Sequence, residues 1–520
     1  MNNPLFNQYH NGIVTAILTG DKNLIVEAGP GSGKTWSVKN AIVPALLEKG
    51  AKNGRCIAFN GKNAYELKAA IQSPKVECST VHSLGLSILR AHNRYLKVDT
   101  AQEAGKDKYD RWQKARNGKA LDIAENYFPD VSESDRQKAV TLADLMKVNG
   151  FGLPGFPSFD DTGEIQKLRD RHSINSNNNN FEDDDSDRIT EIAIEICKVS
   201  VRASGSVDFA DMLYLPLYLN LPLPHLDFVV YDEGQDCKPA ELELLKRFHA
   251  NGARIVIVGD GNQGINLFAG AMPDALERAA EVLQAQCLPL PVSFRCSQAA
   301  ANLANGVFPN SIIAGPNAKP GSVKSVDWQE FVSAFNVAGN ETGALSRVHR
   351  YLLPLALALI RQQQQFRYKG VQKTVDAMER HLYHAAKQSG DLSDIRRTLT
   401  EKQAELEDRY AGKKMPKWVQ TQGEVVECLS LLMATVESNG GDMATVKSYL
   451  KALSKAEKAN NGPTLSTIHA AKGMEWPVVY LIGALRSTLA ETDEELRAEQ
   501  CAEYVALTRS SDRIITVTPA

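Results

Sequence analysis

A glycine-rich stretch near the N-terminus reads Ala28-Gly29-Pro30-Gly31-Ser32-Gly33-Lys34-Thr35. The apolar run at residues 23–27 before it predicts a buried parallel strand, and residues 36–47 after it place apolar side chains at helical spacing. Strand, glycine loop and helix in this order are the context of a phosphate-binding loop, in which backbone N–H groups surround phosphate oxygens at a helix N-terminus. Lys34 would reach the β- and γ-phosphates, and the Thr35 hydroxyl would bind Mg²⁺.

One position of this loop departs from the usual pattern, because Ala28 stands where the first glycine is expected. The alternative interpretation is a glycine-rich turn without a ligand. The loop, its lysine and hydroxyl, and the flanking strand and helix all match the phosphate-binding pattern. They therefore favour a bound nucleotide.

The composition describes an ordinary globular chain. Its 520 residues are enough for roughly three or four domains. Hydrophobic residues make up 43% and charged residues 23%, so a sizeable core is available. The formal net charge is −3, which means that any nucleic-acid surface must be a local groove and not a property of the whole chain.

The cysteine pattern and the apolar stretches predict a cytoplasmic location. None of the eight cysteines forms a C-x-x-C pair, which argues against a disulfide framework, a zinc site or an iron–sulfur cluster. The N-terminus lacks the charged and apolar regions of a signal peptide. The longest apolar stretch, residues 352–360, is too short to span a bilayer.

A second apolar strand, residues 228–231, ends in the paired carboxylates Asp232 and Glu233. In a nucleotide hydrolase Asp232 would hold Mg²⁺ through water, and Glu233 would orient and deprotonate the attacking water. Acidic residues in this place can also cap a helix. The phosphate loop upstream favours the catalytic interpretation.

Other candidate site residues stand at the ends of predicted strands, where ligands bind in parallel sheets. Phe59 and Asn60 follow one strand, and Thr80 and His82 follow another; a loop cap is the alternative for each. Gln263 and Phe268 follow the strand at 254–260: Gln263 is placed to sense the γ-phosphate, and Phe268 to stack on a base unless it is a core residue. Near the N-terminus either Gln8 or His10 could read adenine, or this segment is a polar helix cap.

Two helical, charged regions interrupt the alternation of strands and helices. The first ends in an Asn/Asp-rich tract at residues 175–185 that predicts a mobile loop, and the sheet is expected to resume near residues 207–212. We therefore predict a first α/β lobe from residues 1–95 and 196–290 with a helical insertion at 96–195. A second lobe is predicted from residues 291–370 and 458–520, with a reduced insertion at 371–457.

The set of motifs resembles the superfamily 1 DNA helicases of the UvrD/Rep (PcrA) type. The segments AGPGSGKT, DEGQD, VGDGNQGINLFAGA, SFRCS, STIHAAKGMEW and EYVALTR occur in the family's order, and FNGKNAYEL and TVHSLG resemble its early DNA-contacting motifs. The match covers nearly the whole chain outside the two insertions. The resemblance implies two RecA-like lobes of α/β fold, each with a helical insertion, with ATP between them.

The resemblance also implies roles for individual residues. Lys34, Thr35, Asp232, Glu233 and Gln263 would serve ATP and Mg²⁺ as described above. Arg295 and Arg509 would be arginine fingers, Glu475 would touch the ribose, and Phe294 and Trp36 would lie beside adenine. The DNA strand would contact Phe59, Asn60, Thr80, His82, Phe268 and His469.

The implied function is an ATP-dependent helicase that moves 3′→5′ along single-stranded DNA and acts at junctions of single and double strands. Asn266 and Ala269 replace a tyrosine and an arginine of the family, and the second insertion is short. These departures keep open a competing function, a DNA-stimulated translocase that remodels protein–DNA complexes without separating strands. A degenerate DNA-binding module is a third interpretation, which the intact Lys34, Glu233, Arg295 and Arg509 oppose.

Overall fold

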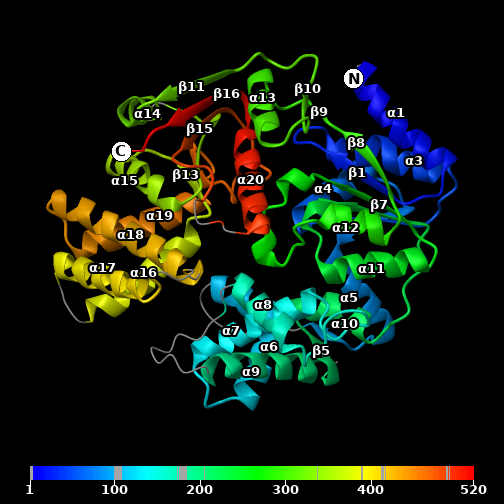
Figure 1. Ribbon diagram of the computed structural model, residues 1–520, viewed down its shortest axis with the longest axis horizontal. Helices are drawn as coiled ribbons and strands as arrows, with labels where there is room; N and C mark the ends of the chain where they lie inside the picture. The colour runs from blue at the N-terminus through cyan, green and yellow to red at the C-terminus, as the bar shows by residue number, and fades with distance from the viewer. Residues whose placement is uncertain are drawn as a thin grey trace. The chain divides into compact units, whose positions relative to one another are not determined.

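Two parallel β-sheets organise the chain, each at the centre of one structural unit (Figure 1). The computed structural model describes residues 4–98, 108–172, 174, 184–203, 205–335, 338–387, 391–411, 415, 417–487, 490 and 492–519. The first unit comprises Met1–Ala28 and Gly33–Leu290, and the second comprises Gly29–Ser32 and Pro291–Ala520.

The sheet of the first unit has six parallel strands in the order β3-β2-β6-β7-β1-β8. The strands are β1 (Leu24–Ala28), β2 (Gly54–Ala58), β3 (Val76–Thr80), β6 (Phe228–Asp232), β7 (Arg254–Gly259) and β8 (Gln286–Leu290). The central strands β6 and β7 are apolar apart from Asp232 at the end of β6 and Arg254 at the start of β7, and every residue except the partly buried Arg254 is buried, as expected for strands covered on both faces. Pro289 lies in the edge strand β8, where a missing N–H costs no hydrogen bond with a second neighbour.

Helices alternate with the strands of this unit along the chain. They are α1 (Pro4–Thr19), α2 (Lys34–Ser37), α3 (Val43–Glu48), α4 (Gly61–Ile71), α5 (Val81–His92), α10 (Phe209–Tyr218), α11 (Pro239–Ala250) and α12 (Ala275–Val282). The helix predicted at 36–47 is divided by a π-helical turn, Val38–Ile42. Pro44 follows this turn. In a regular α-helix its ring would clash with the carbonyl four residues earlier, which explains the wider π-helical turn.

The expectation that the sheet resumes near residues 207–212 is wrong. The strand β5 (Ser206–Val207) pairs with β4 (Lys97–Val98) in a separate two-stranded ribbon, and α10 begins at Phe209. The Asp208 side chain accepts a hydrogen bond from the backbone N–H of Asp211 at 2.9 Å. This N-cap is a strong helix-start signal, and it outweighs the apolar run that suggested a strand.

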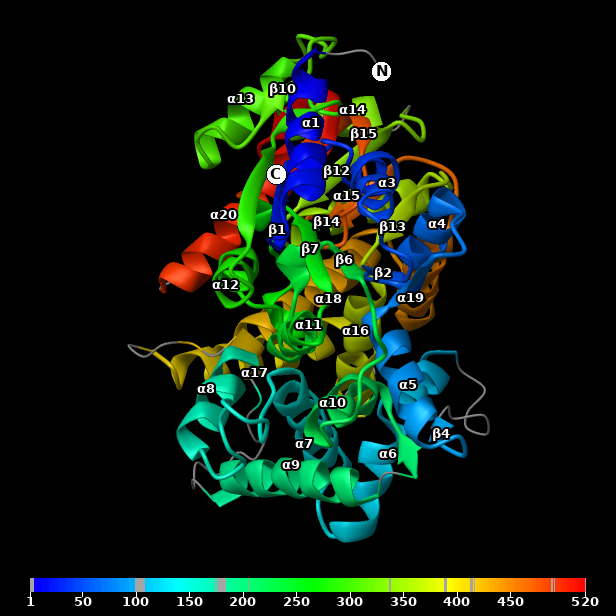
Figure 2. The same cartoon turned by 90° about the vertical axis from the view of Figure 1, so that its right-hand side faces the viewer.

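Within the described residues, four helices occupy the region predicted as the first helical insertion, and the last of them runs past the predicted boundary at residue 195: α6 (Lys108–Tyr127), α7 (Glu133–Val148), α8 (Thr162–His172) and α9 (Asp184–Arg202). Figure 2 shows them gathered with α5 and α10 in the blue-green part of the chain. Of the Asn/Asp-rich tract predicted to be mobile, residues 175–183 lie outside the described residues. Asp184 and Asp185 begin α9, so these last two residues of the predicted loop are helical.

A buried network of lysines and aspartates joins these helices to α10. Lys147 Nζ lies 2.7 Å from Asp211 Oδ1 and Lys119 Nζ lies 2.8 Å from Asp211 Oδ2. The Ser200 hydroxyl also donates to Asp211 Oδ1, at 2.8 Å. Burial lowers the pKa of Lys147, but the facing Asp208 and Asp211 outweigh burial and hold this pKa well above its usual value. The network fixes α6, α7 and α9 against α10, the helix that Asp208 caps.

We expect Asp211→Asn to weaken this part of the fold by about 3–5 kcal/mol, because two buried ammonium groups lose their shared carboxylate. Hydrogen–deuterium exchange of peptides from α7 and α10 measures the effect as faster exchange. Glu164→Gln is the matched control, since the pair of Glu164 with Lys167 is exposed to solvent and should be worth less than about 1 kcal/mol. Equal exchange in the two variants would contradict the prediction.

The second unit repeats the architecture with a six-stranded parallel sheet in the order β11-β16-β15-β12-β14-β13. The strands are β11 (Ser322–Val326), β12 (Thr342–Ser346), β13 (Arg367–Lys369), β14 (Thr464–Thr467), β15 (Trp476–Ile482) and β16 (Ser510–Val517). The predicted α/β fold with two RecA-like lobes is confirmed.

The helices of the second unit include α13 (Gln298–Val307), α14 (Trp328–Phe335), α15 (Leu353–Arg361) and α20 (Asp493–Leu507). A second helical group consists of α16 (Gln372–Ala386), α17 (Leu392–Asp408), α18 (Lys417–Ser438) and α19 (Met443–Lys458). None of the helices in the described ranges combines the length and the apolar character needed to cross a membrane.

Candidate active site

The glycine loop follows β1 and ends at the first turn of α2. Gly33 has φ 82°, a left-handed conformation that a glycine adopts without strain, and it is the N-cap residue of α2. Its carbonyl accepts a hydrogen bond from the Ser37 N–H at 2.8 Å, which closes the first helical turn. The Thr35 side chain is exposed, and the structure gives Lys34 Nζ no hydrogen-bond partner among the described residues. Both groups are therefore available to a ligand.

The acidic pair stands at the carboxyl end of β6, on the same edge of the sheet as the glycine loop. Asp232 is buried, and burial together with the neighbouring Glu233 raises the pKa of Asp232 to about 7. The positive charge of Lys34 acts in the opposite direction. Glu233 has φ 58°, an uncommon backbone conformation for a non-glycine residue and one that clusters at functional sites.

A hydrogen bond from the Gln235 side chain holds the Glu233 carboxylate, and Gln235 was not among the predicted site residues. Gln235 Nε2 donates to Glu233 Oε2 at 2.6 Å, while Gln235 Oε1 accepts the Asp260 N–H at 2.8 Å. A Cβ on Gly259 would lie 2.7 Å from Gln235 Oε1, so a glycine is needed there. The signal was present in the motif DEGQD, whose buried glutamine follows the acidic pair at the end of the strand.

Gln263, the predicted γ-phosphate sensor, lies at the end of the neighbouring strand β7. Its amide donates to Asp260 Oδ2 at 2.6 Å, and both side chains are buried. Burial raises the pKa of Asp260, while Lys34 lowers it. The sheet order brings these groups together because β6, β7 and β1 are consecutive neighbours.

The donor set at this edge fits Mg²⁺ bound mainly by substrate oxygens. Among the described residues no three His, Cys, Asp or Glu side chains converge into a metal cage. Magnesium usually takes one or two protein carboxylates together with phosphate oxygens and water. Thr35 and Asp232 are the hydroxyl and the carboxylate predicted for such a site. The hydroxyl of Ser32, in the same loop, is buried without a hydrogen-bond partner among the described residues, as expected for a group that serves a ligand.

The two candidate adenine readers on α1 lie in different environments. His10 is buried, its Nε2 is 2.7 Å from Ser37 Oγ, and its ring meets Trp36 edge to face with centroids 5.2 Å apart. Gln8 is exposed. His10 thus fixes the start of the loop helix and Trp36, whereas Gln8 keeps its amide accessible.

Phe294 and Arg295 lie in the second unit, next to loop residues 29–32, which group with that unit. The Ser293 hydroxyl donates to the Pro30 carbonyl at 2.7 Å, and the Phe294 N–H donates to the Gly31 carbonyl at 2.9 Å. The Phe294 ring is 48% exposed, as a stacking surface must be. The Arg295 guanidinium forms an ion pair with Glu475, so the candidate finger and the candidate ribose contact bind each other in this structure.

Arg509, the second candidate finger, is buried in its own unit. Its guanidinium donates to the carbonyl of Val505 at 2.9 Å, to the carbonyl of Met474 at 3.2 Å and to Thr508 Oγ1 at 3.0 Å. Contact with a phosphate would require at least one of these bonds to be exchanged.

The candidate DNA contacts of the first unit lie at the carboxyl ends of the adjacent strands β2 and β3. Phe59 is 48% exposed. Asn60 and Thr80 cap α4 and α5, accepting hydrogen bonds from Asn63 N at 2.9 Å and Ser83 N at 3.2 Å. The His82 ring stacks on Phe209, with centroids 3.7 Å apart and planes at 19°.

Phe209 is a functional candidate that sequence reasoning missed. Its ring is 40% exposed although it is a large aromatic side chain beside the candidate DNA contacts. The sequence signal was the segment VDFADM, which was interpreted as a strand instead of a helix start. An exposed, pre-stacked aromatic pair is a suitable platform for a nucleic-acid base.

The remaining candidate DNA contacts are Phe268 in the first unit and His469 in the second. The backbone of Phe268 forms part of a short 3₁₀ turn, Leu267–Ala269, and its side chain lies outside the described residues. His469 follows β14 in the second unit, where burial and the nearby Arg347 lower the pKa of His469 to about 4. Arg347 itself pairs with Glu499 through two hydrogen bonds, of 3.0 and 2.7 Å.

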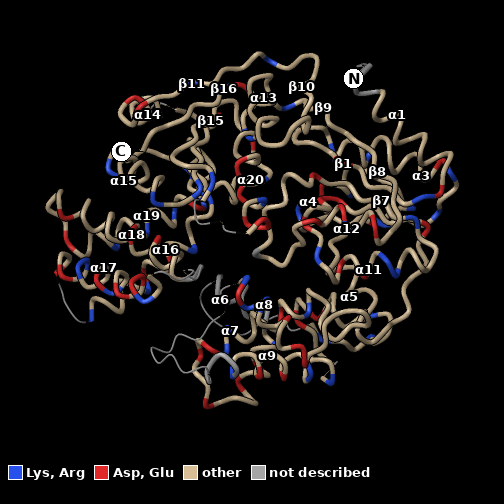
Figure 3. The backbone as a smooth tube through the Cα atoms, in the orientation of Figure 1, with Lys and Arg blue, Asp and Glu red and all other residues tan. Residues whose placement is uncertain are grey.

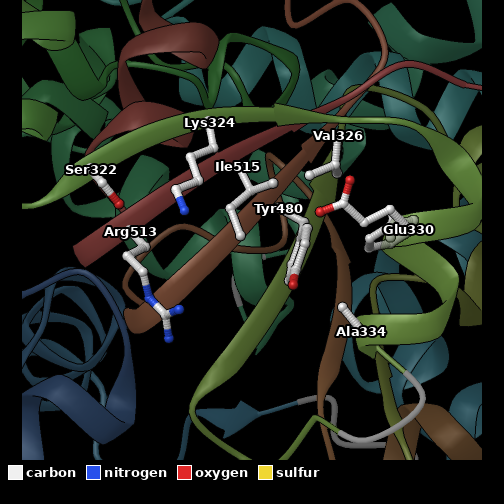
Figure 4. Close-up of a pocket in the computed structure, with 9 residues that line it drawn as sticks. Ser322, Lys324, Val326, Glu330, Ala334, Tyr480, Arg513 and Ile515 are labelled. Carbon is white, nitrogen blue, oxygen red and sulfur yellow. The ribbon is translucent and has the colours of Figure 1, made fainter.

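A small cavity of about 150 Å³ lies elsewhere in the second unit, on one face of β11, β15 and β16 beside α14 (Figure 4). Lys324, Arg513, Tyr480 and Glu330 contribute its polar groups. None of the residues predicted for ATP or DNA lines this cavity.

A glycine loop and an acidic strand end on one edge of a parallel sheet define the P-loop class of nucleoside triphosphatases. The model of the UvrD/REP helicase N-terminal domain matches residues 10–284, and that of the UvrD-like helicase C-terminal domain matches residues 301–518. The chain therefore belongs to the UvrD/Rep family of ATP-dependent DNA helicases.

Individual relatives are distant. The chain is 21% identical to the ATP-dependent DNA helicase PcrA of Staphylococcus aureus over 633 aligned positions, covering 98% of this chain and 83% of the relative. It is 23% identical to DNA helicase II of Haemophilus influenzae over 309 positions, covering 56% of this chain and 38% of that protein. A match to PcrA of Leuconostoc citreum has 24% identity and covers 58% of this chain and 39% of the relative.

Proposed function

We propose that this chain hydrolyses ATP with Mg²⁺ and uses the energy to move 3′→5′ along single-stranded DNA, separating strands at a junction with duplex. One observation carries the proposal. The first sheet presents the glycine loop and the Asp232–Glu233 pair on the edge where Phe59 and the His82–Phe209 stack also lie. A nucleotide reaction and a base-stacking surface are thus attached to the ends of neighbouring strands. Such an activity and the eight free cysteines agree with a cytoplasmic location.

The proposed chemistry assigns one task to each side chain. Bound Mg²⁺ would neutralise charge on the phosphate oxygens, with Thr35 and Asp232 as the residues that hold it. Lys34 contacts the β- and γ-phosphates. The Glu233 carboxylate, held by Gln235, accepts the proton of the attacking water. Gln263 senses the γ-phosphate.

The remaining candidate residues, which come from both units, complete the proposed assignment. Arg295 and Arg509 stabilise the charge that develops on the transferred phosphoryl group. Phe294 and Trp36 flank adenine, Gln8 reads its edge, and Glu475 holds the ribose. For Arg295 and Glu475, these tasks require their mutual ion pair to open.

The energies of stacking and strand separation are comparable. Stacking a base on an aromatic side chain is worth about 1–3 kcal/mol and does not depend on sequence. Opening one duplex step costs about 1.4 kcal/mol on average. Aromatic platforms that alternately hold and release bases can therefore be coupled to single steps along the strand.

Strand displacement on duplexes with a 3′ or a 5′ tail, with ATP turnover measured in parallel, tests the proposal. We expect displacement from the 3′ tail alone. ATP turnover that DNA stimulates without displacement would support the competing function, a translocase that remodels protein–DNA complexes, which the departures at Asn266 and Ala269 keep open. The absence of any stimulation by single-stranded DNA would refute both.

Phe209→Ala is expected to raise the concentration of single-stranded DNA that half-saturates the ATPase by about 5- to 150-fold, since one stacking platform is lost. Titrations with an oligothymidine measure the change. Tyr383→Ala serves as control, because it also removes an exposed aromatic ring. Tyr383 is 63% exposed and lies on α16 of the second unit. Half-saturation that is the same in both variants would remove Phe209 from the DNA path.

A further inference from the structure

A group of basic side chains at the far end of α5 has no place in the function proposed so far. We call it the basic tip and define it as Arg90, His92, Arg94, Tyr95 and Lys97, all of which are exposed. The Tyr95 side chain is 92% exposed, more than any other large hydrophobic or aromatic residue in the described part of the chain. An exposed aromatic ring among cations is a common composition for a nucleic-acid contact.

The charges of the basic tip are not neutralised locally. No Asp or Glu occurs between Glu77 and Asp99 in the sequence. Within the described ranges the structure gives no ion pair to Arg90, Arg94 or Lys97. The chain as a whole has a net charge of −3, and Figure 3 shows both signs interspersed along most of it. The basic tip is therefore a local concentration of positive charge and not a consequence of composition.

The backbone of the basic tip is held in place. Asn93 ends α5, and its side chain accepts a hydrogen bond from the Tyr95 N–H at 3.1 Å. Leu96 is buried, and the Lys97 N–H donates to the Gly205 carbonyl at 3.1 Å in the β4–β5 ribbon. The ribbon brings in the end of α9, where Arg202 is exposed. Figure 2 shows α5 and β4 at the flank of this unit.

The position of the basic tip relates it to the candidate single-strand contacts. His82 lies in the first turn of α5, and the basic tip begins in the last turn of the same helix and continues beyond it. Twelve residues of α-helix span about 18 Å. That distance corresponds to about five base pairs of stacked duplex. A nucleic acid that reaches from the His82–Phe209 stack to the basic tip must therefore be continuous over several nucleotides.

We propose that the basic tip binds the phosphate backbone of the duplex arm when the protein sits at a junction of single- and double-stranded DNA. The inference rests on the proposed function and assigns residues to the duplex side of its substrate. Cations at a helix C-terminus can instead serve the helix dipole, but this explains Arg90 and His92 alone, because Arg94 and Lys97 lie beyond the helix. A single-stranded path is lined by successive aromatic side chains, whereas the basic tip combines one ring with cations spread over a helix end and a ribbon.

The double variant Arg94→Glu/Lys97→Glu tests this assignment by fluorescence anisotropy with a single strand, a blunt duplex and a tailed duplex. We expect affinity for the tailed and blunt duplexes to fall about tenfold at 0.1 M salt, with affinity for the single strand within about twofold of wild type. The slope of log affinity against log salt for the tailed duplex should shrink by about 2, as two phosphate contacts are lost. Arg94→Gln/Lys97→Gln should shift the affinity in the same direction by less, which keeps the test valid if the charge reversal impairs folding.

Lys22→Glu/Lys75→Glu is the matched control. It makes the same change of charge on exposed lysines that precede β1 and β3. These lysines lie at the amino ends of the strands of the six-stranded sheet, opposite the edge that carries the candidate single-strand contacts. Duplex affinity that falls equally in the control and in the test variant would overturn the proposal, because it would reflect net charge alone. Equal losses on single strand and tailed duplex would also overturn it, placing the basic tip on the single-strand path. Unchanged binding of all three DNAs would overturn the proposal as well, because the basic tip would then not contact DNA.

Failure of the proposed function can be distinguished from failure of the basic-tip assignment. Wild-type protein that single-stranded DNA fails to stimulate refutes that function whatever the basic-tip variants do. Wild-type protein that is stimulated normally, with no loss of duplex affinity in Arg94→Glu/Lys97→Glu, refutes the assignment of the basic tip alone.

Discussion

Glu233→Gln is expected to lower ATP turnover by about 10²–10⁴-fold while the affinity for ATP stays near that of wild type. The substitution keeps the size of the side chain, and the new amide oxygen can still accept the hydrogen bond from Gln235. What is lost is the carboxylate that takes a proton from water. Steady-state turnover and binding of a fluorescent ATP analogue measure the two effects.

Glu277→Gln provides the control for this variant, because it makes the same chemical change at an exposed position on α12. Its turnover should equal that of wild type. If Glu233→Gln also turned over within a few-fold of wild type, the attacking water would have to be activated by another group, and the assignment of the acidic pair would fail.

Arg295→Ala is expected to reduce turnover by about 10³–10⁵-fold, the range associated with an arginine finger. Arg295→Lys should recover little of this, since lysine keeps the charge but not the planar fork of donors. Single-turnover hydrolysis measures the chemical step directly. The ion pair with Glu475 offers the sharpest comparison, because either partner can be removed alone.

Glu475→Gln breaks the same ion pair but leaves the candidate finger intact. We expect it to raise KM for ATP through the lost ribose contact, with a much smaller change in kcat. If both variants lost the same modest factor in kcat, the pair would have a structural role alone and Arg295 would not be the finger.

Much of the fold was predictable because its strands are short apolar runs separated by helices. The strands at Leu24–Ala28 and Phe228–Asp232 lie within one residue of the predicted runs. The predicted strand near residues 207–212 was wrong because Asp208, an effective helix cap, stands within an apolar segment. Local pattern alone cannot decide between a cap and a strand end when the run is only a few residues long.

The site was predictable in its motifs and less so in its contacts. Placing Asp232 and Lys34 at one edge follows from parallel strands, whose carboxyl ends coincide. The bond from Gln235 to Glu233 and the stack of His82 on Phe209 depend on distances that no motif encodes. Phe209 meets His82 because α10 packs against α5, two helices that the first insertion separates in the sequence.

The strand order of the first sheet has a consequence for synthesis of the chain. Strands β1 and β2 are made early, yet they are not neighbours, because β6 and β7 lie between them. At roughly 5–20 residues per second, a ribosome needs about 10–50 s to proceed from the end of β1 to the end of β7. During that interval the apolar strand β1 has no sheet partner, because its neighbours β7 and β8 are made later. We therefore expect newly made chains to depend on chaperones until the ribosome has passed Gly259.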